Sequence, residues 1–187
     1  MNQSKGGEDL IEALSRLVQA GRDVRLVMIG AKVGSSDPTN QAYLARVEQL
    51  IQAAGLGERV VWTGYLPDSE VTATWKATDV CVLPYRDGAS KRRGTLMAAL
   101  AHGVPIVTTT PQLPVAHFRD GENMLLVPPS NPQALSSAVA RIADDLALQQ
   151  RLAAGALGLS RQFTWPAIAA ATLDFYTDVR RKRGMIP

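Results

Sequence analysis

Cysteine and histidine are scarce in this sequence. Cys81 is the only cysteine, and His102 and His117 are the only histidines among 187 residues. A single cysteine inside an apolar run can form neither an internal disulfide nor a cysteine-based metal site, and we expect it to lie in the core. No His-x-x-x-His pattern or carboxylate cluster lies near the histidines. We therefore expect no metal site and no resident cofactor.

Long hydrophobic runs and a strong net charge are absent too. No apolar run is long enough to span a membrane, and the N-terminal residues do not resemble a signal peptide, so the expected location is cytoplasmic. The formal net charge is only +3, and the basic residues gather partly at 91–93 and 180–183. This charge is too small and too local for a dedicated nucleic-acid-binding protein, and we expect no nucleic-acid partner.

What the sequence does contain is a regular alternation of helical and strand patterns. Helices are predicted at 8–18, 43–51, 68–77, 94–101, 134–146, 148–156 and 165–179, and strands at 24–30, 60–62, 80–83, 105–108 and 124–127. Such alternation predicts an α/β protein with a Rossmann-like, doubly wound parallel sheet. We expect a single domain over 1–187, with a C-terminal helix and basic tail over 165–187. The alternation opens on a loop, as if a leading strand were lacking.

The segment 84–109 is the one around which the chain is organised. A polar loop carrying Arg86 and the basic cluster 91–93 follows an apolar strand, and a helix then begins at Gly94-Thr95. The unpaired amides and positive dipole end of that helix face the same volume as the cationic side chains, which favours a phosphate. A basic loop is by itself more often a solvated turn. Its place at the carboxyl end of a strand, where open α/β sheets bind ligands, favours the phosphate site.

Several segments together resemble the C-terminal, donor-binding domain of GT-B glycosyltransferases of group 1 (family 4). The resemblance depends on their order and spacing, which cover nearly the whole chain. The segments are 5–6, 64–67, 77–84, 98–107 and 119–129. The resemblance implies a single GT-B C-terminal domain that lacks its first strand.

In that family a lysine before the first helix and the N-terminus of the helix after the central loop hold the diphosphate of a nucleotide-sugar. The resemblance therefore implies a nucleotide-diphosphate site made of Lys5, Arg92, Arg93, Gly94 and Thr95. Cations and amides fixed around the departing diphosphate stabilise the transition state of a retaining sugar transfer without a metal. Alternatively, Lys5 is only an exposed loop residue that takes no part in binding.

The sequence departs from the family at its usual pair of glutamates. In the register of the resemblance, the ribose-binding glutamate falls on Ala98 and the loop glutamate on Ser90. Alanine cannot accept a hydrogen bond from a ribose hydroxyl, and serine carries no charge to offset a developing oxocarbenium ion. Asp87 is the nearest acidic side chain that can replace the loop carboxylate, and an aspartate that caps its own turn is an equal alternative. The candidate catalytic residues are therefore Asp87 and Ser90.

The implied function is that of the donor-binding half of a retaining glycosyltransferase, active in polysaccharide or glycoconjugate synthesis. Such an enzyme transfers a sugar from a nucleotide-diphosphate sugar to a glycan, lipid or small-molecule acceptor. In the family an N-terminal domain grips the acceptor, so we expect that domain or a separate chain as partner, and no sugar transfer by this chain alone. The alternative is a degenerate, non-catalytic module that binds a nucleotide or a partner. A third alternative is another GT-B-like enzyme, such as a nucleotide-sugar epimerase. It would need a carboxylate pair or a histidine in the cleft, and we identify neither in the sequence.

The C-terminal helix and its basic end at 180–183 admit two accounts. In the family the last helix packs on the N-terminal domain, which predicts an exposed apolar face in this chain. The second account is an amphipathic helix at the inner face of the membrane, whose basic end meets anionic lipid. Four basic residues fit only a weak, reversible peripheral contact.

Overall fold

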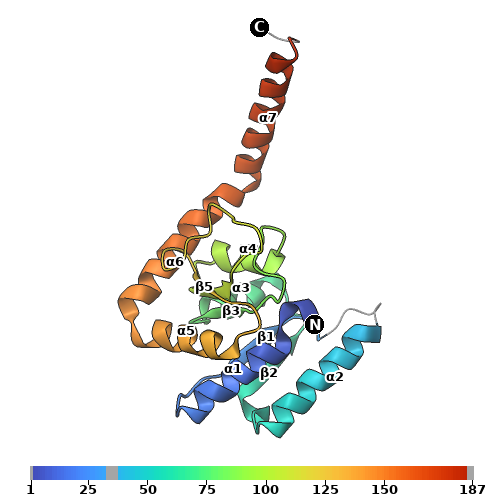
Figure 1. Ribbon diagram of the computed structural model, residues 1–187, viewed down its shortest axis with the longest axis vertical. Coiled ribbons are helices and arrows are strands. Elements are labelled where there is room, and N and C mark those ends of the chain that lie inside the picture. Colours follow the sequence, from blue (N-terminus) through green and yellow to red (C-terminus); the bar gives the residue numbers. More distant parts are fainter. Residues whose placement is uncertain (1, 33–37, 185–187) are drawn as a thin grey trace.

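The computed structural model describes residues 2–32 and 38–184, in which helices and parallel strands alternate (Figure 1). The strands are β1 (Leu26–Ile29), β2 (Val60–Gly64), β3 (Cys81–Leu83), β4 (Ile106–Thr109) and β5 (Leu125–Val127). The helices are α1 (Gly7–Gln19), α2 (Pro38–Ala53), α3 (Asp68–Lys76), α4 (Gly94–Ala101), α5 (Pro132–Asp144), α6 (Leu146–Ser160) and α7 (Trp165–Lys182). Short 3-10 turns are η1 (Gln3–Lys5), η2 (Gly57–Arg59) and η3 (Arg161–Phe163). The predicted α/β class is confirmed, and every predicted helix and strand is present, with shifted ends.

Local sequence explains where several of these helices begin. The side chains of Asn131 and Asp145 each accept a hydrogen bond of 2.9 Å from a first-turn amide, at the starts of α5 and α6. Such caps satisfy amides that have no partner inside the helix. Helix α3 instead begins at Asp68 after Pro67, which makes no side-chain bond to the first turn.

The strands form two separate parallel ladders. β1 pairs with β2, with Leu26 opposite Val60, and β4 lies between β3 and β5. Within residues 2–32 and 38–184, no hydrogen-bonded ladder joins β1 to β3. The sheet is therefore parallel, as predicted, but it is interrupted between β1 and β3. The first elements of the described chain are η1 and α1.

Helix α1 holds the two halves of the sheet together. Its Ile11 and Leu14 pack in a buried cluster with α2 and β2, and β1 residues pack against that cluster. Its Ala13 instead belongs to a cluster with α5, α6, β4 and β5. The opposite face of β3 and β4 is covered by α3, α4 and α6, through a third cluster that includes Trp75 and Leu100. Helices therefore lie on both faces of the β3–β5 ladder, as a parallel sheet requires.

Helix α7 projects away from the rest of the molecule (Figure 1). None of its residues is buried, and Trp165, Leu173 and Phe175 are 83%, 67% and 64% exposed. The expected exposed apolar face is therefore present, and what covers it stays a prediction. None of the helices described here combines the length and the apolar character that crossing a bilayer requires.

Candidate functional site

The candidate site lies at the carboxyl end of β3, where η1 meets the loop that joins β3 to α4. The backbone amide of Arg86 donates to the carbonyl of Ser4 at 2.9 Å. Gly6 adopts a φ of +66° against Pro84, and a Cβ at Gly6 would lie 2.0 Å from the Pro84 carbonyl oxygen. Only glycine fits so close an approach with that backbone conformation. Lys5 lies between these two contacts, so the predicted lysine and the predicted loop share one edge of the sheet.

Two buried threonines at the end of β4 fix the start of the loop. The Thr108 hydroxyl donates to the Leu83 carbonyl at 2.8 Å, and the Thr109 hydroxyl donates to the Tyr85 carbonyl at 2.7 Å. The amide of Ala89 in turn donates to the Thr109 carbonyl at 3.2 Å. Both threonines are fully buried. A loop bonded to the sheet in this way presents its amides in a fixed geometry, which an anion site needs.

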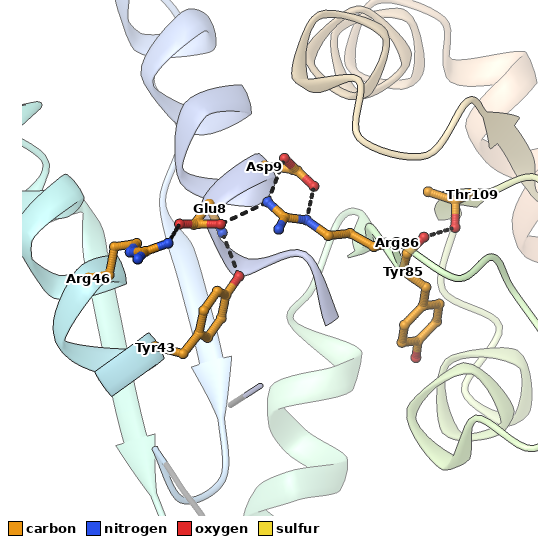
Figure 2. Close-up of polar contacts among 7 residues, drawn as sticks. All are labelled: Glu8, Asp9, Tyr43, Arg46, Tyr85, Arg86 and Thr109. Carbon is orange, nitrogen blue, oxygen red and sulfur yellow. Dashed lines mark hydrogen bonds and ion pairs between the residues drawn. The ribbon is translucent and has the colours of Figure 1, made fainter. Parts of the chain in front are cut away.

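Arg86 joins the loop to the first turn of α1 (Figure 2). Its Nε lies 3.1 Å from Asp9 Oδ2, and its Nη2 lies 2.8 Å from Glu8 Oε2. Glu8 also meets Arg46 at 3.4 Å, and its backbone amide donates to the Tyr43 hydroxyl at 3.1 Å. The hydrogen bonds to Asp9 are the main cause that raises the pKa of Arg86, with a smaller contribution from Glu8. Arg86 therefore ties the loop to α1 through ion pairs with Glu8 and Asp9.

Replacing Arg86 by methionine is expected to destabilise the fold by about 2 kcal/mol, because Asp9, only 8% exposed, would lose its cation. The matched control is Arg16→Met, which breaks an exposed pair between Arg16 and Glu12. That control should lower the free energy of unfolding by roughly 0.5 kcal/mol or less. Urea unfolding of both variants gives the comparison, and equal losses would show that the Arg86 tie contributes no more than a surface ion pair.

Arg93, a predicted diphosphate ligand, contacts Asp87, the predicted catalytic carboxylate. The guanidinium makes an ion pair with both Asp87 carboxylate oxygens, and it lies 4.5 Å from the centre of the Tyr85 ring. Asp87 is exposed, whereas Tyr85 is buried and burial raises its pKa to about 12. The sequence predicted Asp87 as a replacement for the family's loop carboxylate or as a turn cap. The structure shows an ion pair instead, which orients Arg93 over the aromatic ring.

The other predicted cations are more accessible. Lys5 and Arg92 are exposed, and neither forms an ion pair with a carboxylate in the described part of the chain. Lys91 differs, because its ammonium lies 5.8 Å from the centre of the Phe163 ring. Lys5 and Arg92 therefore carry positive charge that the described protein does not neutralise, on the same edge of the fold as Arg93.

Helix α4 begins at the end of this loop without a capping side chain. Its N-cap residue Arg93 has an extended backbone and no side-chain bond to the first turn, and both Gly94 and Thr95 are exposed. The first-turn amides of a helix have no partner within the helix, and its N-terminus carries partial positive charge. An uncapped helix start therefore lies next to Arg92 and Arg93. Binding itself stays a prediction.

The two positions that lack the family's glutamates are both half-buried. Ser90 lies in the loop, where its carbonyl accepts the amide of Arg93 at 3.2 Å. Ala98 lies in α4, and its carbonyl oxygen is 2.8 Å from Nδ1 of His102. His102 also stacks on Trp75 with ring centres 5.7 Å apart, so it packs at the end of α4. Across residues 2–32 and 38–184, no group of three or more His, Cys, Asp and Glu side chains could hold a metal ion.

Sequence reasoning missed the residues that support this edge, namely Glu8, Asp9, Thr108 and Thr109. The one available signal was the acidic pair at the start of α1, which also suits a helix N-terminus and therefore indicates no distant partner. The partner, Arg86, lies 77 residues from Asp9 along the chain, so the pairing appears only in the folded structure.

Comparison with known proteins agrees with this architecture. A family model described as "Glycosyl transferases group 1" matches residues 1–145. The D-inositol 3-phosphate glycosyltransferase of Corynebacterium glutamicum is 30% identical over 178 residues, which are 93% of this chain and 40% of that protein. This chain therefore spans less than half the length of that relative.

Solved structures show the same fold. Sucrose-phosphate synthase of Thermosynechococcus elongatus matches with a TM-score of 0.77 and 27% identity, over 97% of this chain and 44% of its own. Anabaena HepE, solved in complex with UDP, matches with a TM-score of 0.81 and 20% identity, over 95% of this chain and 46% of its own. With its Rossmann-like GT-B domain and a family match over most of its length, the chain belongs to the group 1 glycosyltransferases.

Proposed function

We propose that this chain is the donor-binding part of a retaining glycosyltransferase and that it binds the diphosphate of a nucleotide-sugar. One observation carries the proposal: the uncapped start of α4 lies beside Arg92 and Arg93, at the end of a loop that two buried threonines fix to the sheet. The bound UDP of the structural neighbour HepE is consistent with a nucleotide-sugar donor.

The cations of the site have different roles in this proposal. Arg93 is positioned by Asp87 and by the face of Tyr85, so a diphosphate would share this guanidinium with Asp87. Lys5 and Arg92 supply charge that no carboxylate in the described residues offsets. As the sugar leaves, negative charge grows on the nucleoside diphosphate, and hydrogen bonds to charged donors strengthen. Stabilisation of that leaving group is the catalytic contribution we assign to this chain.

The positions of Ser90 and Ala98 imply that the rest of the nucleotide is held weakly. No side chain at Ala98 can accept a hydrogen bond from the ribose, and Ser90 offers only a neutral hydroxyl. Affinity would then depend mainly on the diphosphate. The acceptor would be bound by a domain or chain that supplies the other wall of the cleft, and we expect this chain alone to transfer no sugar.

Calorimetric titration of the chain with UDP, GDP, ADP and TDP tests the proposal. We expect saturable binding of at least one nucleotide, and a loss of about tenfold or more in affinity in Lys5→Ala/Arg92→Ala, because each cation would make a charge-assisted hydrogen bond. The control is Lys76→Ala/Arg141→Ala, which removes the same charge from two other exposed positions. An equal loss in the control would show that only overall charge matters.

The second candidate is a degenerate module that no longer handles a donor, which the absence of a carboxylate at both Ser90 and Ala98 favours. In that case the folded chain would bind none of the nucleotides in the same titration. Sugar transfer from a nucleotide-sugar by the chain alone, without an acceptor domain, would contradict both candidates.

A further inference from the structure

The backbone on both sides of Lys5 is held by the segment that follows β3. The carbonyl of Ser4 accepts the amide of Arg86 at 2.9 Å, and Gly6 packs against the Pro84 carbonyl. Both contacts are made by main-chain atoms, so they do not depend on the side chain of residue 86. The place of Lys5 is therefore set by backbone geometry, whereas the direction of its ammonium depends on the charges within its reach.

Two carboxylates lie close to Lys5 along the chain. Glu8 and Asp9 follow it by three and four residues, and no other acidic residue is as near in sequence. Both are shielded from water, since Asp9 is 8% exposed and the Glu8 side chain is 19% exposed. A shielded carboxylate needs a cation or hydrogen-bond donors. The flexible ammonium of a lysine can meet this need.

Arg86 meets this need instead (Figure 2). Its Nε lies 3.1 Å from Asp9 Oδ2, and its Nη2 lies 3.3 Å from Asp9 Oδ1 and 2.8 Å from Glu8 Oε2. The other carboxylate oxygen of Glu8 meets Arg46 at 3.4 Å. Within residues 2–32 and 38–184, these two arginines are the only cations that form ion pairs with the carboxylates, and Lys5 stays exposed.

We propose that Arg86 is a positioning residue of the candidate diphosphate site. By holding the two carboxylates at the start of α1, its guanidinium leaves the Lys5 ammonium free to bind phosphate. The inference rests on the proposed function, because it concerns the same ligand. Without the guanidinium, the ammonium would turn toward the shielded carboxylates, while the main-chain contact at Ser4 would still hold η1 against the loop.

A double-mutant cycle with UDP, GDP, ADP and TDP as probes tests this role. Calorimetry measures the affinity of each nucleotide for the parent chain and for Arg86→Met, and for both again in a Lys5→Ala background. We expect Arg86→Met to weaken binding by about threefold or more when Lys5 is present, and by less than about twofold when it is absent. A general loss of structure or of positive charge would weaken binding equally in both backgrounds.

Removing the carboxylates as well gives a second measurement. Arg86→Met/Glu8→Gln/Asp9→Asn leaves no shielded charge without a partner, so it should stay folded even where Arg86→Met does not. We expect its nucleotide affinity to lie within about twofold of that of the parent chain, because no carboxylate then competes for the lysine.

The outcomes separate this inference from the proposed function. Equal weakening by Arg86→Met with and without Lys5 would overturn the inference alone. So would a triple variant that is folded but binds nucleotide at least threefold more weakly than the parent chain, a limit of about the size expected for one coupled pair. A folded parent chain that binds none of the four nucleotides would overturn the inference together with the proposed function.

Discussion

Replacing Gly6 by alanine is expected to lower the free energy of unfolding by about 3 kcal/mol or more. The new Cβ would lie 2.0 Å from the Pro84 carbonyl oxygen, so η1 and the loop must separate. The backbone at Gly6 also has a φ of +66°, which L residues other than glycine adopt at a cost. The same separation would move Lys5 away from the loop. Urea unfolding measures the stability, and titration with UDP measures the effect on the site.

Gly21→Ala is the matched control for this variant. Gly21 has a φ of +79°, but nothing lies within 4 Å of a Cβ at that position. The substitution should therefore lower the free energy of unfolding by roughly 1 kcal/mol, through backbone strain at the positive φ alone, and leave nucleotide affinity unchanged. If both variants lost the same stability, the contact between Gly6 and Pro84 would not be what holds η1 against the loop.

Replacing each of two glycines in helix α6 by alanine should change the free energy of unfolding in opposite directions. Gly155 packs on the turn that precedes β5, and a Cβ there would lie 2.1 Å from the Glu122 carbonyl oxygen and 2.9 Å from the Asn123 Cα. The turn cannot move easily, because the buried Asn123 side chain donates to the His117 carbonyl and accepts the Arg119 amide. We expect Gly155→Ala to destabilise the fold by about 3 kcal/mol or more.

Gly158 lies one helical turn further along α6, and nothing lies within 4 Å of a Cβ at that position. Alanine is the better helix former, so Gly158→Ala should stabilise the protein by roughly 0.5–1 kcal/mol. Thermal or urea unfolding of both variants tests the pair. Stabilisation by Gly155→Ala would show that α6 does not press against the turn as described.

Much of the fold could be predicted because its signals are local. Periodic apolar residues mark α1 and α2, short β-branched runs mark β2 and β4, and Asn131 followed by proline marks the start of α5. Each of these patterns depends on residues close together in sequence. The parallel arrangement then follows from the alternation of helices and strands.

The candidate site could be predicted only in part. The basic loop and the start of α4 were visible in sequence, because a charged, glycine-bearing segment after a strand is a local pattern. The ion pair that Arg93 forms with Asp87 was not predicted, although the two residues lie in the same loop. The tie from Arg86 to Glu8 and Asp9 was not visible either, because it joins segments that only the fold brings together. Side-chain pairing depends on geometry that residue types alone do not specify.

The most direct test of the central claim is a titration of isotope-labelled protein with UDP, followed by amide chemical shifts in two-dimensional NMR spectra. The account predicts that the largest shifts fall on Gly94 and Thr95 at the start of α4 and on Lys5 in η1. Arg92→Ala should reduce these shifts at a given UDP concentration. Shifts that cluster instead at the opposite end of the strands, around the open polar pocket lined by Arg25 and Arg59, would contradict the account.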